Sequence, residues 1–597
     1  MIHINQVDNT YVVKFPYDAA LVSAIKSVPG RSYHSETRAW TIPRNNLGIF
    51  IAQIKGTSYE SELIIQSSED IGQNYDMLPT SIPEVDVSNL PMYVESGSNV
   101  YPHQLDFMKY AISRQIQGNT NGFILGDEQG CGKTLETINL ALYNKQALNF
   151  NHTLIICCVN TAKYHWAADI EKHTNGEYSG YILGSRKNKK GHIRTDTGNS
   201  ERLEDLNKLI SNSESLPYFL ILNIEAIRYK QGKKYPIADA IIELANSGTL
   251  NLIAIDEVHK GTSCQSKQGK QILRIKNRTE NRLMWIPITG TPIVSKPTDV
   301  FLPLYLVGGH AYKSYYTWCL HFCIYGGFGG HEIIAYKNTK EIQTMLSCNM
   351  IRRLKSEVLN LPPKIYYTEY VDNTSYQNKM YSDALSGILQ NKEAITSSLN
   401  PLSLLLKLRQ VNGCPEILDP EFFNQSNYIQ KNAKLVRVLE LIEDIHSRQE
   451  KVVIFSNWLQ PLRTLYKLLQ SKYNVCCYTG TMDNDIREKH KEVFIHNPKY
   501  TIMLGTIGAL GTMHTLTVAN NVIFLDEPWT ATDKMQAEDR CHRISTSKPV
   551  NIYTIITRNT IDDRVHDILY KKHSISQIIV DNIDIHSHPE LLDILLQ

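Results

Sequence analysis

Short, uninterrupted apolar runs recur along the chain and predict buried strands. Each run is rich in β-branched residues, as expected for parallel strands covered on both faces. Helical patterns alternate with the runs, for example over Thr134–Tyr143 and Leu459–Leu469. This alternation predicts two open α/β sheets. The runs are Thr153–Cys158, Phe219–Asn223, Leu252–Asp256 and Leu283–Thr289 in the first half, and Val452–Ser456, Thr501–Thr506, Val522–Asp526 and Ile552–Ile556 in the second.

The remaining stretches divide the chain into further parts. The segment from about Pro297 to Ala433, between the two predicted sheets, has a mostly helical pattern. Residues 1–58 alternate as strands do, and residues 67–99 carry the Pro, Gly, Ser and Asp typical of a linker. The predicted domains are a small module (1–58), a linker (59–98), a first lobe with a helical protrusion (99–365), a helical protrusion with a second lobe (366–570) and a C-terminal tail (571–597).

Composition narrows the class of protein. Hydrophobic residues make up 42% and charged residues 20% of the chain, as in ordinary globular proteins, and no apolar run is long enough to predict a membrane span. The first residues lack the pattern of a secretion signal. Eleven scattered cysteines without a Cys-x-x-Cys pair are typical of reduced thiols in a cytoplasmic protein. The net charge is only +2, so any contact with nucleic acid must come from a local cleft.

The first candidate for chemistry is a glycine-rich loop, Gly126-Asp-Glu-Gln-Gly130-Cys-Gly132-Lys133-Thr134, between an apolar run and a predicted helix. Glycines let the backbone turn so that N–H groups point at phosphate oxygens. Lys133 is predicted to reach the β- and γ-phosphates, and the Thr134 hydroxyl to bind Mg²⁺. The alternative is a glycine-rich turn that binds no ligand. The other predicted nucleotide-binding residues in the loop are Asp127, Glu128, Gly130, Cys131 and Gly132.

An acidic pair follows the third apolar run. Asp256 and Glu257 come directly after the run that begins at Leu252. A carboxylate at the end of a strand is well placed to hold Mg²⁺, which we predict for Asp256. Glu257 is then predicted to activate the attacking water. Alone, such a pair is often an ordinary loop acid, but together with the glycine-rich loop it indicates a nucleotide-hydrolysing site.

With both motifs present, the chain resembles the Swi/Snf branch of superfamily 2 helicases, whose phosphate loop has the form Asp-Glu-x-Gly-x-Gly-Lys-Thr. The segment ending in Gln104 resembles the part of this family that contacts adenine, which implies that Gln104 reads the base. Further matches follow in the family order: Lys163 with Trp166, Thr289-Gly-Thr291-Pro, residues 351–364, Leu408-Arg409-Gln410, Thr506 to Thr517 and residues 536–544. The resemblance implies DNA contacts at Lys163, Thr289, Thr291, Thr506 and Gly511.

The last of these matches contains two arginines, Arg540 and Arg543, which the spacing places on one face of a predicted helix. Arginine is planar and always charged, so it suits contact with a γ-phosphate, and Gln536 completes the set that the resemblance implies to be catalytic. The alternative is a solvated basic helix face. Two regions depart from the family pattern, at Met513-His514-Thr515-Leu516 and at Ser545-Thr546.

Residues 1–58 bear a fainter resemblance to the accessory module of HARP-type annealing helicases, through Phe15-Pro-Tyr17, Lys26, Pro29-Gly-Arg31 and Trp40-Thr-Ile-Pro43. Aromatic and basic residues together are suited to gripping a nucleic-acid junction. The alternative is a small β-rich packing module with a buried tryptophan.

Together the resemblances imply an α/β fold of two RecA-like lobes with helical insertions, using ATP and Mg²⁺. The implied function is translocation on double-stranded or branched DNA, with roles in repair or recombination and a bacterial or phage origin. One alternative is a strand-separating helicase on single-stranded DNA or RNA. Another is a nucleotide-gated subunit of a defence or restriction complex.

Overall fold

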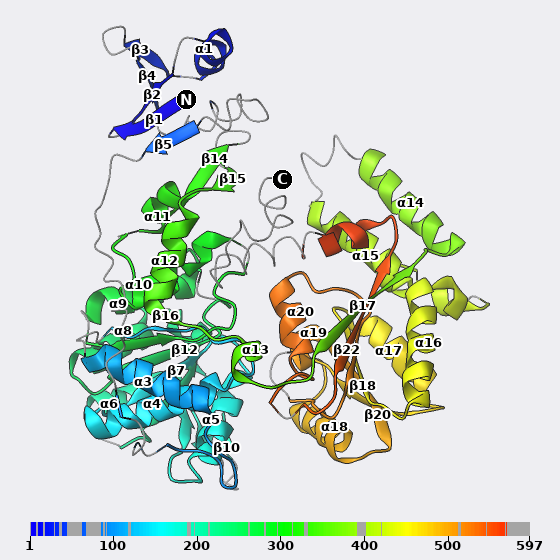
Figure 1. Cartoon of the computed structure of the whole chain (residues 1–597). Helices are drawn as coiled ribbons and strands as arrows, with labels where there is room; N and C mark the ends of the chain where they lie inside the picture. Colours follow the sequence, from blue (N-terminus) through cyan, green and yellow to red (C-terminus); the bar gives the residue numbers. More distant parts are fainter. Residues whose placement is uncertain are drawn as a thin grey trace.

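Two parallel sheets covered by helices, and a mixed five-stranded sheet ahead of them, are the main sheets of the computed structural model of the chain (Figure 1). The described residues run from Ile2 to Leu569 with gaps. Outside the description lie residues 1, 8–9, 16–17, 29, 35–38, 44–49, 51–62, 67–84, 87–89, 91, 117–120, 188–192, 196–197, 213–214, 261–262, 280–281, 295, 313, 327–331, 391–400, 420, 425, 512–514, 545, 568 and 570–597. The predicted C-terminal tail and much of the predicted linker are among them.

The first sheet has the order β13-β12-β7-β11-β8, and neighbouring strands are parallel. Side chains of β7 enter the two cores alternately, because successive residues of a strand point to opposite faces. Leu154 and Ile156 pack under α6, α8 and α9, while Ile155 and Cys157 pack under α3, α4 and α5. The strands are β7 (Thr153–Cys157), β8 (Gly180–Ile182), β11 (Phe219–Asn223), β12 (Leu252–Asp256) and β13 (Met284–Pro287). The helices are α3 (Pro102–Ile116), α4 (Lys133–Ala147), α5 (Ala162–His173), α6 (Asn199–Ile210), α8 (Pro236–Asn246) and α9 (Lys267–Thr279).

The second sheet repeats this plan in the order β17-β22-β21-β18-β20-β19. Val452 and Ile454 of β18 pack with α16 and α17, whereas Val453 and Phe455 pack with α18, α19 and α20. The predicted fold class, two RecA-like α/β lobes, is therefore confirmed. The strands are β17 (Lys364–Val371), β18 (Val452–Ser456), β19 (Asn474–Tyr478), β20 (Tyr500–Thr506), β21 (Asn521–Phe524) and β22 (Val550–Thr557). The helices are α16 (Ala433–Ser447), α17 (Leu459–Leu469), α18 (Asn484–His496), α19 (Ile507–Leu510) and α20 (Ala531–Glu538).

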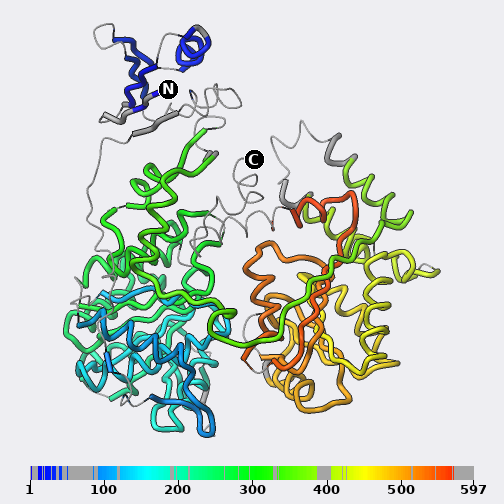
Figure 2. The backbone as a smooth tube through the Cα atoms, in the orientation of Figure 1, coloured from blue at the N-terminus to red at the C-terminus, as the bar shows by residue number. Residues whose placement is uncertain are grey.

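The segment from Pro297 to Ala433 is less uniformly helical than predicted. It contains α10 (Phe301–Leu306), α11 (Tyr315–Phe322), α12 (Thr339–Asn349), α14 (Ser375–Gln390) and α15 (Pro401–Gly413), but also β14 (Cys323–Gly326), β15 (Glu332–Tyr336), β16 (Met350–Ile351) and β17. Strand β16 pairs with β6 (Ile124–Leu125) at the edge of the first lobe, and β17 is the edge strand of the second sheet. The chain between β16 and β17 therefore crosses from one lobe to the other, as the green tube in Figure 2 shows. The boundary predicted after residue 365 falls inside β17.

The N-terminal sheet has the order β3-β4-β2-β1-β5 and packs against α1 (Ala19–Lys26). Its strands are β1 (Ile2–Val7), β2 (Thr10–Lys14), β3 (Ser32–His34), β4 (Ala39–Pro43) and β5 (Leu63–Gln66). Because β5 pairs with β1, the sheet extends beyond the predicted boundary at residue 58. Trp40 is only partly buried, and its ring lies 4.9 Å from that of the exposed Tyr33.

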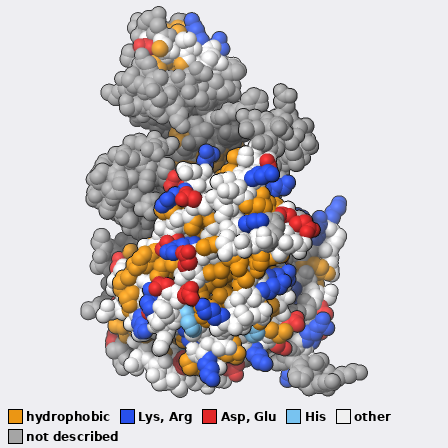
Figure 3. All heavy atoms as spheres, turned by 90° about the vertical axis from the view of Figure 1, so that its right-hand side faces the viewer, with side chains coloured by type: hydrophobic (Ala, Val, Ile, Leu, Met, Phe, Trp, Pro, Cys, Tyr) orange, Lys and Arg blue, Asp and Glu red, His pale blue; other side chains and the backbone are white. Residues whose placement is uncertain are grey.

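Charges are mixed over the surface on the side of the second lobe. Figure 3 shows Lys and Arg side chains interspersed with Asp, Glu and apolar side chains on this face. This mixture agrees with the low net charge of the chain. In the described part of the chain, no helix combines the length and the apolar character needed to cross a bilayer.

Candidate active site

A cleft of about 970 Å³ lies between the two lobes and is lined by both of them. It collects most of the side chains that the sequence assigns to nucleotide chemistry. From the first lobe it is lined by Gln104, Gly130, Gly132, Lys133, Thr134, Asp256 and Glu257, and from the second by Arg540 and Arg543. Residues separated by about 400 positions in the chain thus face one space.

The glycine-rich loop turns tightly at the start of α4. Gly132 has a φ of +95°, and a Cβ atom at this position would lie 2.6 Å from Nε2 of Gln104. Glycine is therefore required both by the backbone conformation and by the predicted adenine reader packed against it. Lys133 Nζ donates hydrogen bonds to the carbonyl oxygens of Asp127 (2.8 Å) and Glu128 (3.1 Å), which hold it over the loop. The backbone N–H groups at this helix start form an anion site.

Three of the predicted nucleotide-binding side chains shape the loop from outside the cleft. Asp127 is fully buried, and its carboxylate pairs with the guanidinium of Arg353. One carboxylate oxygen of Glu128 accepts a hydrogen bond from the backbone N–H of Lys355 (2.8 Å). Cys131 is also fully buried, and burial raises the pKa of its thiol to about 12. Their place in the nucleotide-binding loop stays a prediction, and any contact that they make with phosphates would come from their backbone N–H groups.

Asp256 and Glu257 lie at the carboxyl end of β12 and face the cleft. Burial and the neighbouring Glu257 raise the pKa of Asp256 to about 6. Glu257 has a φ of +49°, a left-handed conformation that is strained for a residue with a side chain. Its Oε2 atom is buried beside Nδ1 of His259 (3.3 Å), while part of the side chain is exposed to the cleft.

The oxygen donors at this end of the cleft fit Mg²⁺. The ion prefers oxygen ligands and keeps several waters, so one or two protein ligands and the phosphates of a nucleotide suffice. The Thr134 hydroxyl and the Asp256 carboxylate line the same cleft as Lys133. In the described part of the chain no group of three or more His, Cys, Asp or Glu side chains is arranged to hold a metal by itself.

The side chain of Thr289 contacts other residues of the first lobe. It is fully buried, and its Oγ1 lies 2.8 Å from Nδ1 of His259 and accepts the backbone N–H of Thr291 (3.0 Å). His259 Nδ1 also lies 3.3 Å from Oε2 of Glu257. The predicted direct DNA contact of Thr289 is therefore corrected: its side chain is occupied in a chain of polar contacts that ends at the active-site acid.

Two other predicted DNA contacts are also enclosed by protein. Lys163 is 2% exposed, and its Nζ lies 4.8 Å from the centre of the Tyr164 ring. Gly511 is buried, and its carbonyl oxygen accepts a hydrogen bond from Nε of Arg540 (3.1 Å). Neither residue offers a surface to DNA in this arrangement. Thr291 and Thr506 are half-buried, so their DNA contacts stay predictions.

Arg540 and Arg543 follow α20 rather than lie on it, because the helix ends at Glu538. Arg540 Nε also donates to the carbonyl oxygen of Gln536 (2.9 Å), and Arg543 Nη1 donates to Oγ1 of Thr515 (2.7 Å). Burial lowers the pKa of both guanidinium groups, and the charge of Arg543 lowers that of Arg540 further. An anion between the two guanidinium groups, such as a γ-phosphate, would stabilise their charged forms.

Gln536 connects the lobes instead of lining the cleft. Its Oε1 accepts a hydrogen bond from Nζ of Lys260 (2.6 Å), and its Nε2 lies 3.4 Å from Oε1 of Glu257. Lys260 also pairs with Asp533 of α20 (3.3 Å). The helix that precedes the two arginines is thus joined to the loop that carries the predicted water-activating acid.

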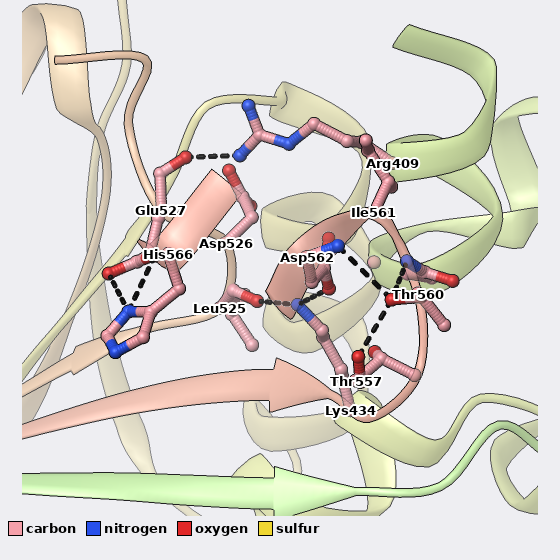
Figure 4. Close-up of polar contacts among 12 residues, drawn as sticks. Arg409, Lys434, Leu525, Asp526, Glu527, Thr557, Thr560, Ile561, Asp562 and His566 are labelled. Atoms are coloured by element: carbon pink, nitrogen blue, oxygen red, sulfur yellow. Dashed lines mark hydrogen bonds and ion pairs between the residues drawn. The ribbon is translucent and has the colours of Figure 1, made fainter. Parts of the chain in front are cut away.

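The second sheet has its own acidic pair at the end of β21, but both carboxylates are engaged. Asp526 accepts hydrogen bonds from Oγ of Ser456 (2.5 Å) and the backbone N–H of Asn457 (2.8 Å). Glu527 pairs with His566 (3.0 Å), and its carbonyl oxygen accepts from Arg409 (Figure 4). This pair is therefore part of the packing of the second lobe.

Some residues of the site were not assigned from the sequence. Trp166 donates to Asp256, and Arg353 and Lys355 hold the phosphate loop. Gln129 lines the cleft, and both polar atoms of its amide are buried without a hydrogen-bond partner among the described residues. Each of these residues lies within or beside a motif matched above, and this closeness in sequence could have indicated that they belong to the site.

Family models match most of the two lobes. The model of the SNF2-related domain matches residues 103–417, and that of the helicase conserved C-terminal domain matches residues 430–545. The chain belongs to the SNF2-related family. The predicted resemblance to the Swi/Snf branch is thereby confirmed, whereas the HARP-type resemblance of the first residues stays a prediction.

Members of the family with similar sequences come from distant organisms. An ATP-dependent helicase of Mycoplasma genitalium, MG018, is 25% identical over 511 residues, covering 83% of this chain and 44% of that protein. The human SWI/SNF-related matrix-associated actin-dependent regulator of chromatin subfamily A member 1 is 24% identical, covering 82% and 44%. The subfamily A-like protein 1 of Xenopus tropicalis is 23% identical, covering 94% and 54%. The chain thus spans about half the length of the curated relatives it matches.

Among solved structures, the chain is similar to the SWI2/SNF2 ATPase core of Sulfolobus solfataricus in complex with double-stranded DNA. That match has 20% identity and a TM-score of 0.34, and it covers 82% of this chain and 94% of the other.

Proposed function

We propose that this SNF2-related chain is an ATP-driven motor that hydrolyses ATP in the interlobe cleft and moves on double-stranded DNA. The observation that carries the proposal is the composition of the cleft: Lys133 and Glu257 line it from the first lobe and Arg543 from the second. Hydrolysis would then need both lobes to approach one nucleotide, which couples turnover to relative motion of the lobes.

The chain's own residues account for each part of the reaction. The loop backbone and Lys133 bind the β- and γ-phosphates, and Thr134 and Asp256 would hold Mg²⁺, which neutralises phosphate charge when bound. The Glu257 carboxylate accepts a proton from the attacking water as the new O–P bond forms and the bond between the β- and γ-phosphates breaks, releasing ADP and phosphate. Arg540 and Arg543 stabilise the charge that develops on the γ-phosphate.

Double-stranded or branched DNA is the proposed track, with remodelling or reannealing as the outcome. Of the three relatives described above, two are named as regulators of chromatin and one as an ATP-dependent helicase. The match to the Xenopus tropicalis protein leaves only 6% of this chain uncovered (100% − 94%), so it extends into the N-terminal module. There the neighbouring rings of Tyr33 and Trp40, tilted by 48° to each other, form an aromatic surface suited to bases at a junction.

The test is ATP hydrolysis measured with no nucleic acid, single-stranded DNA, duplex DNA, forked DNA and RNA. The proposal expects strong stimulation by duplex or forked DNA that is lost in Lys133→Ala and Glu257→Gln. Stimulation by single strands or RNA alone would favour the strand-separating helicase. Absence of turnover under every condition would favour a nucleotide-gated binding subunit.

A further inference from the structure

Residues 351–355, here called the strap, lie against the phosphate loop. The backbone N–H groups of Gly126 and Glu128 donate to the carbonyl oxygens of Ile351 (2.8 Å) and Arg353 (3.0 Å). The backbone N–H of Lys355 returns a hydrogen bond to the Glu128 carboxylate (2.8 Å). Strap and loop are therefore paired much as two strands are, and a displacement of one displaces the other.

The end of the strap reaches into the second lobe through one side chain. Lys355 is 5% exposed, and its Nζ lies 2.7 Å from Oδ1 of Asp539 and donates to the carbonyl oxygen of His542 (3.2 Å). Asp539 and His542 directly precede Arg540 and Arg543 in the sequence. The stem of Lys355 also contacts the loop, since a Cβ atom at Gly130 would lie 3.1 Å from its Cε.

We propose that Lys355 is a positioning residue that couples the phosphate loop to the two arginines of the second lobe. The inference rests on the proposed ATP hydrolysis in this cleft. Separating the two groups leaves the buried ammonium of Lys355 without its carboxylate, so the pair moves as a unit. When phosphates bind and shift the loop, the strap carries Asp539, and with it Arg540 and Arg543, toward the γ-phosphate. Loss of Lys355 should therefore slow hydrolysis more than it weakens nucleotide binding.

The chain offers a matched control in Lys364. Its Nζ pairs with the same Asp539 oxygen (2.8 Å) and with Glu538 (3.1 Å). Lys364 belongs to β17 of the second sheet, however, and the described contacts of its side chain are all with the second lobe. Removing it takes one buried cation from Asp539 and leaves the connection to the phosphate loop intact.

The experiment compares Lys355→Met, Lys364→Met and Lys355→Arg in the full chain, by DNA-stimulated ATPase rate, binding of a fluorescent ADP analogue and thermal unfolding. Lys355→Met should lower kcat by about tenfold or more and change ADP affinity by less than about threefold. Lys364→Met should keep kcat within about threefold of the parent chain although it loses stability, and Lys355→Arg should recover most of the rate. Equal losses of kcat in both methionine variants, or an unchanged kcat in Lys355→Met, would overturn the proposal.

A second variant tests the proposal if Lys355→Met does not fold. Glu128→Ala removes the loop–strap hydrogen bond that Lys355 itself makes and leaves the buried ion pair in place, so a smaller loss of kcat with little change in ADP affinity is expected. Normal turnover in Glu128→Ala would overturn the coupling. The parent chain separates the two proposals: if it hydrolyses ATP and Glu257→Gln does not, the active site stands whatever Lys355 does.

Discussion

The indole Nε1 of Trp166 donates a hydrogen bond of 2.9 Å to Oδ2 of Asp256. The two residues belong to α5 and to the end of β12, and both line the interlobe cleft. The bond fixes one oxygen of the carboxylate that is proposed to hold Mg²⁺. Such supporting contacts orient metal ligands and tune their affinity.

Replacing Trp166 by Phe should weaken the use of Mg²⁺ more than the binding of nucleotide. The change removes the hydrogen-bond donor and keeps an apolar ring, so Asp256 loses its orientation. We expect the Mg²⁺ concentration for half-maximal ATPase activity to rise by about tenfold or more. A magnesium titration of the ATPase rate checks this, with Tyr164→Phe as a control on the same helix. An unchanged magnesium dependence would mean that Trp166 only packs.

Replacing Arg543 by Ala should abolish most turnover and spare the fold. Arg543 is only half-buried and lies in a turn, so its removal opens no large cavity in a core. Loss of a charge that acts on the γ-phosphate should lower the single-turnover rate by about 10²-fold or more. Binding of a fluorescent ADP analogue should change little, since ADP lacks that phosphate. Lys at this position should recover only part of the rate, because it cannot form a bidentate contact.

His310 should make the first lobe sensitive to acid. Its Nδ1 accepts the backbone N–H of Tyr312 (3.2 Å), so its Nε2 carries the proton and donates to the carbonyl oxygen of Phe301 (2.9 Å). Burial lowers the pKa of His310 to about 4. His310 therefore binds a proton more readily in the unfolded chain than in the folded chain. The stability that neutral His310 contributes is fully present above about pH 6.5 and is lost as the pH falls toward 4.

Near pH 5 this loss amounts to about 2 kcal/mol for the single histidine. Thermal unfolding of the parent chain and of His310→Gln at pH 7.5 and pH 5 measures it. The variant should be less stable at pH 7.5 and should lose less on acidification. An identical loss in both proteins would assign the acid sensitivity to other groups.

Lys434 should be needed for the stability of the second lobe. Its buried Nζ pairs with Asp562 (2.7 Å) and donates to the carbonyl oxygen of Leu525 (3.0 Å), as Figure 4 shows. Lys434→Met leaves a buried carboxylate without its cation, which should cost about 3–5 kcal/mol. The exposed pair of Lys472 and Glu443 provides the control, and Lys472→Met should leave the unfolding transition nearly unchanged. Equal shifts in the unfolding of the second lobe would contradict the prediction.

The strands that could be predicted from the pattern are those with the simplest environment. Strands β7, β12, β18 and β21 lie inside their sheets, and their continuous apolar runs reflect burial on both faces. The strands missed by the pattern include β8, β17 and β19, which are all at sheet edges. These three strands are partly exposed and so lack that signal, whereas β13, also at a sheet edge, was predicted because its four residues are buried. Most residues of β17 are exposed, and Tyr366 is 60% exposed.

The sequence by itself determined the chemistry of the site, because a phosphate loop and a strand-end acid pair need contiguous residues such as Gly132-Lys133-Thr134 and Asp256-Glu257. Only the tertiary structure decided which neighbouring side chains face the cleft. Asp127 lies within the loop motif, yet its carboxylate points to Arg353, 226 positions away. Such a pairing depends on the tertiary packing within the first lobe, since a buried charge must find its partner wherever the fold brings one close. No local sequence pattern indicates which distant residue will be the partner.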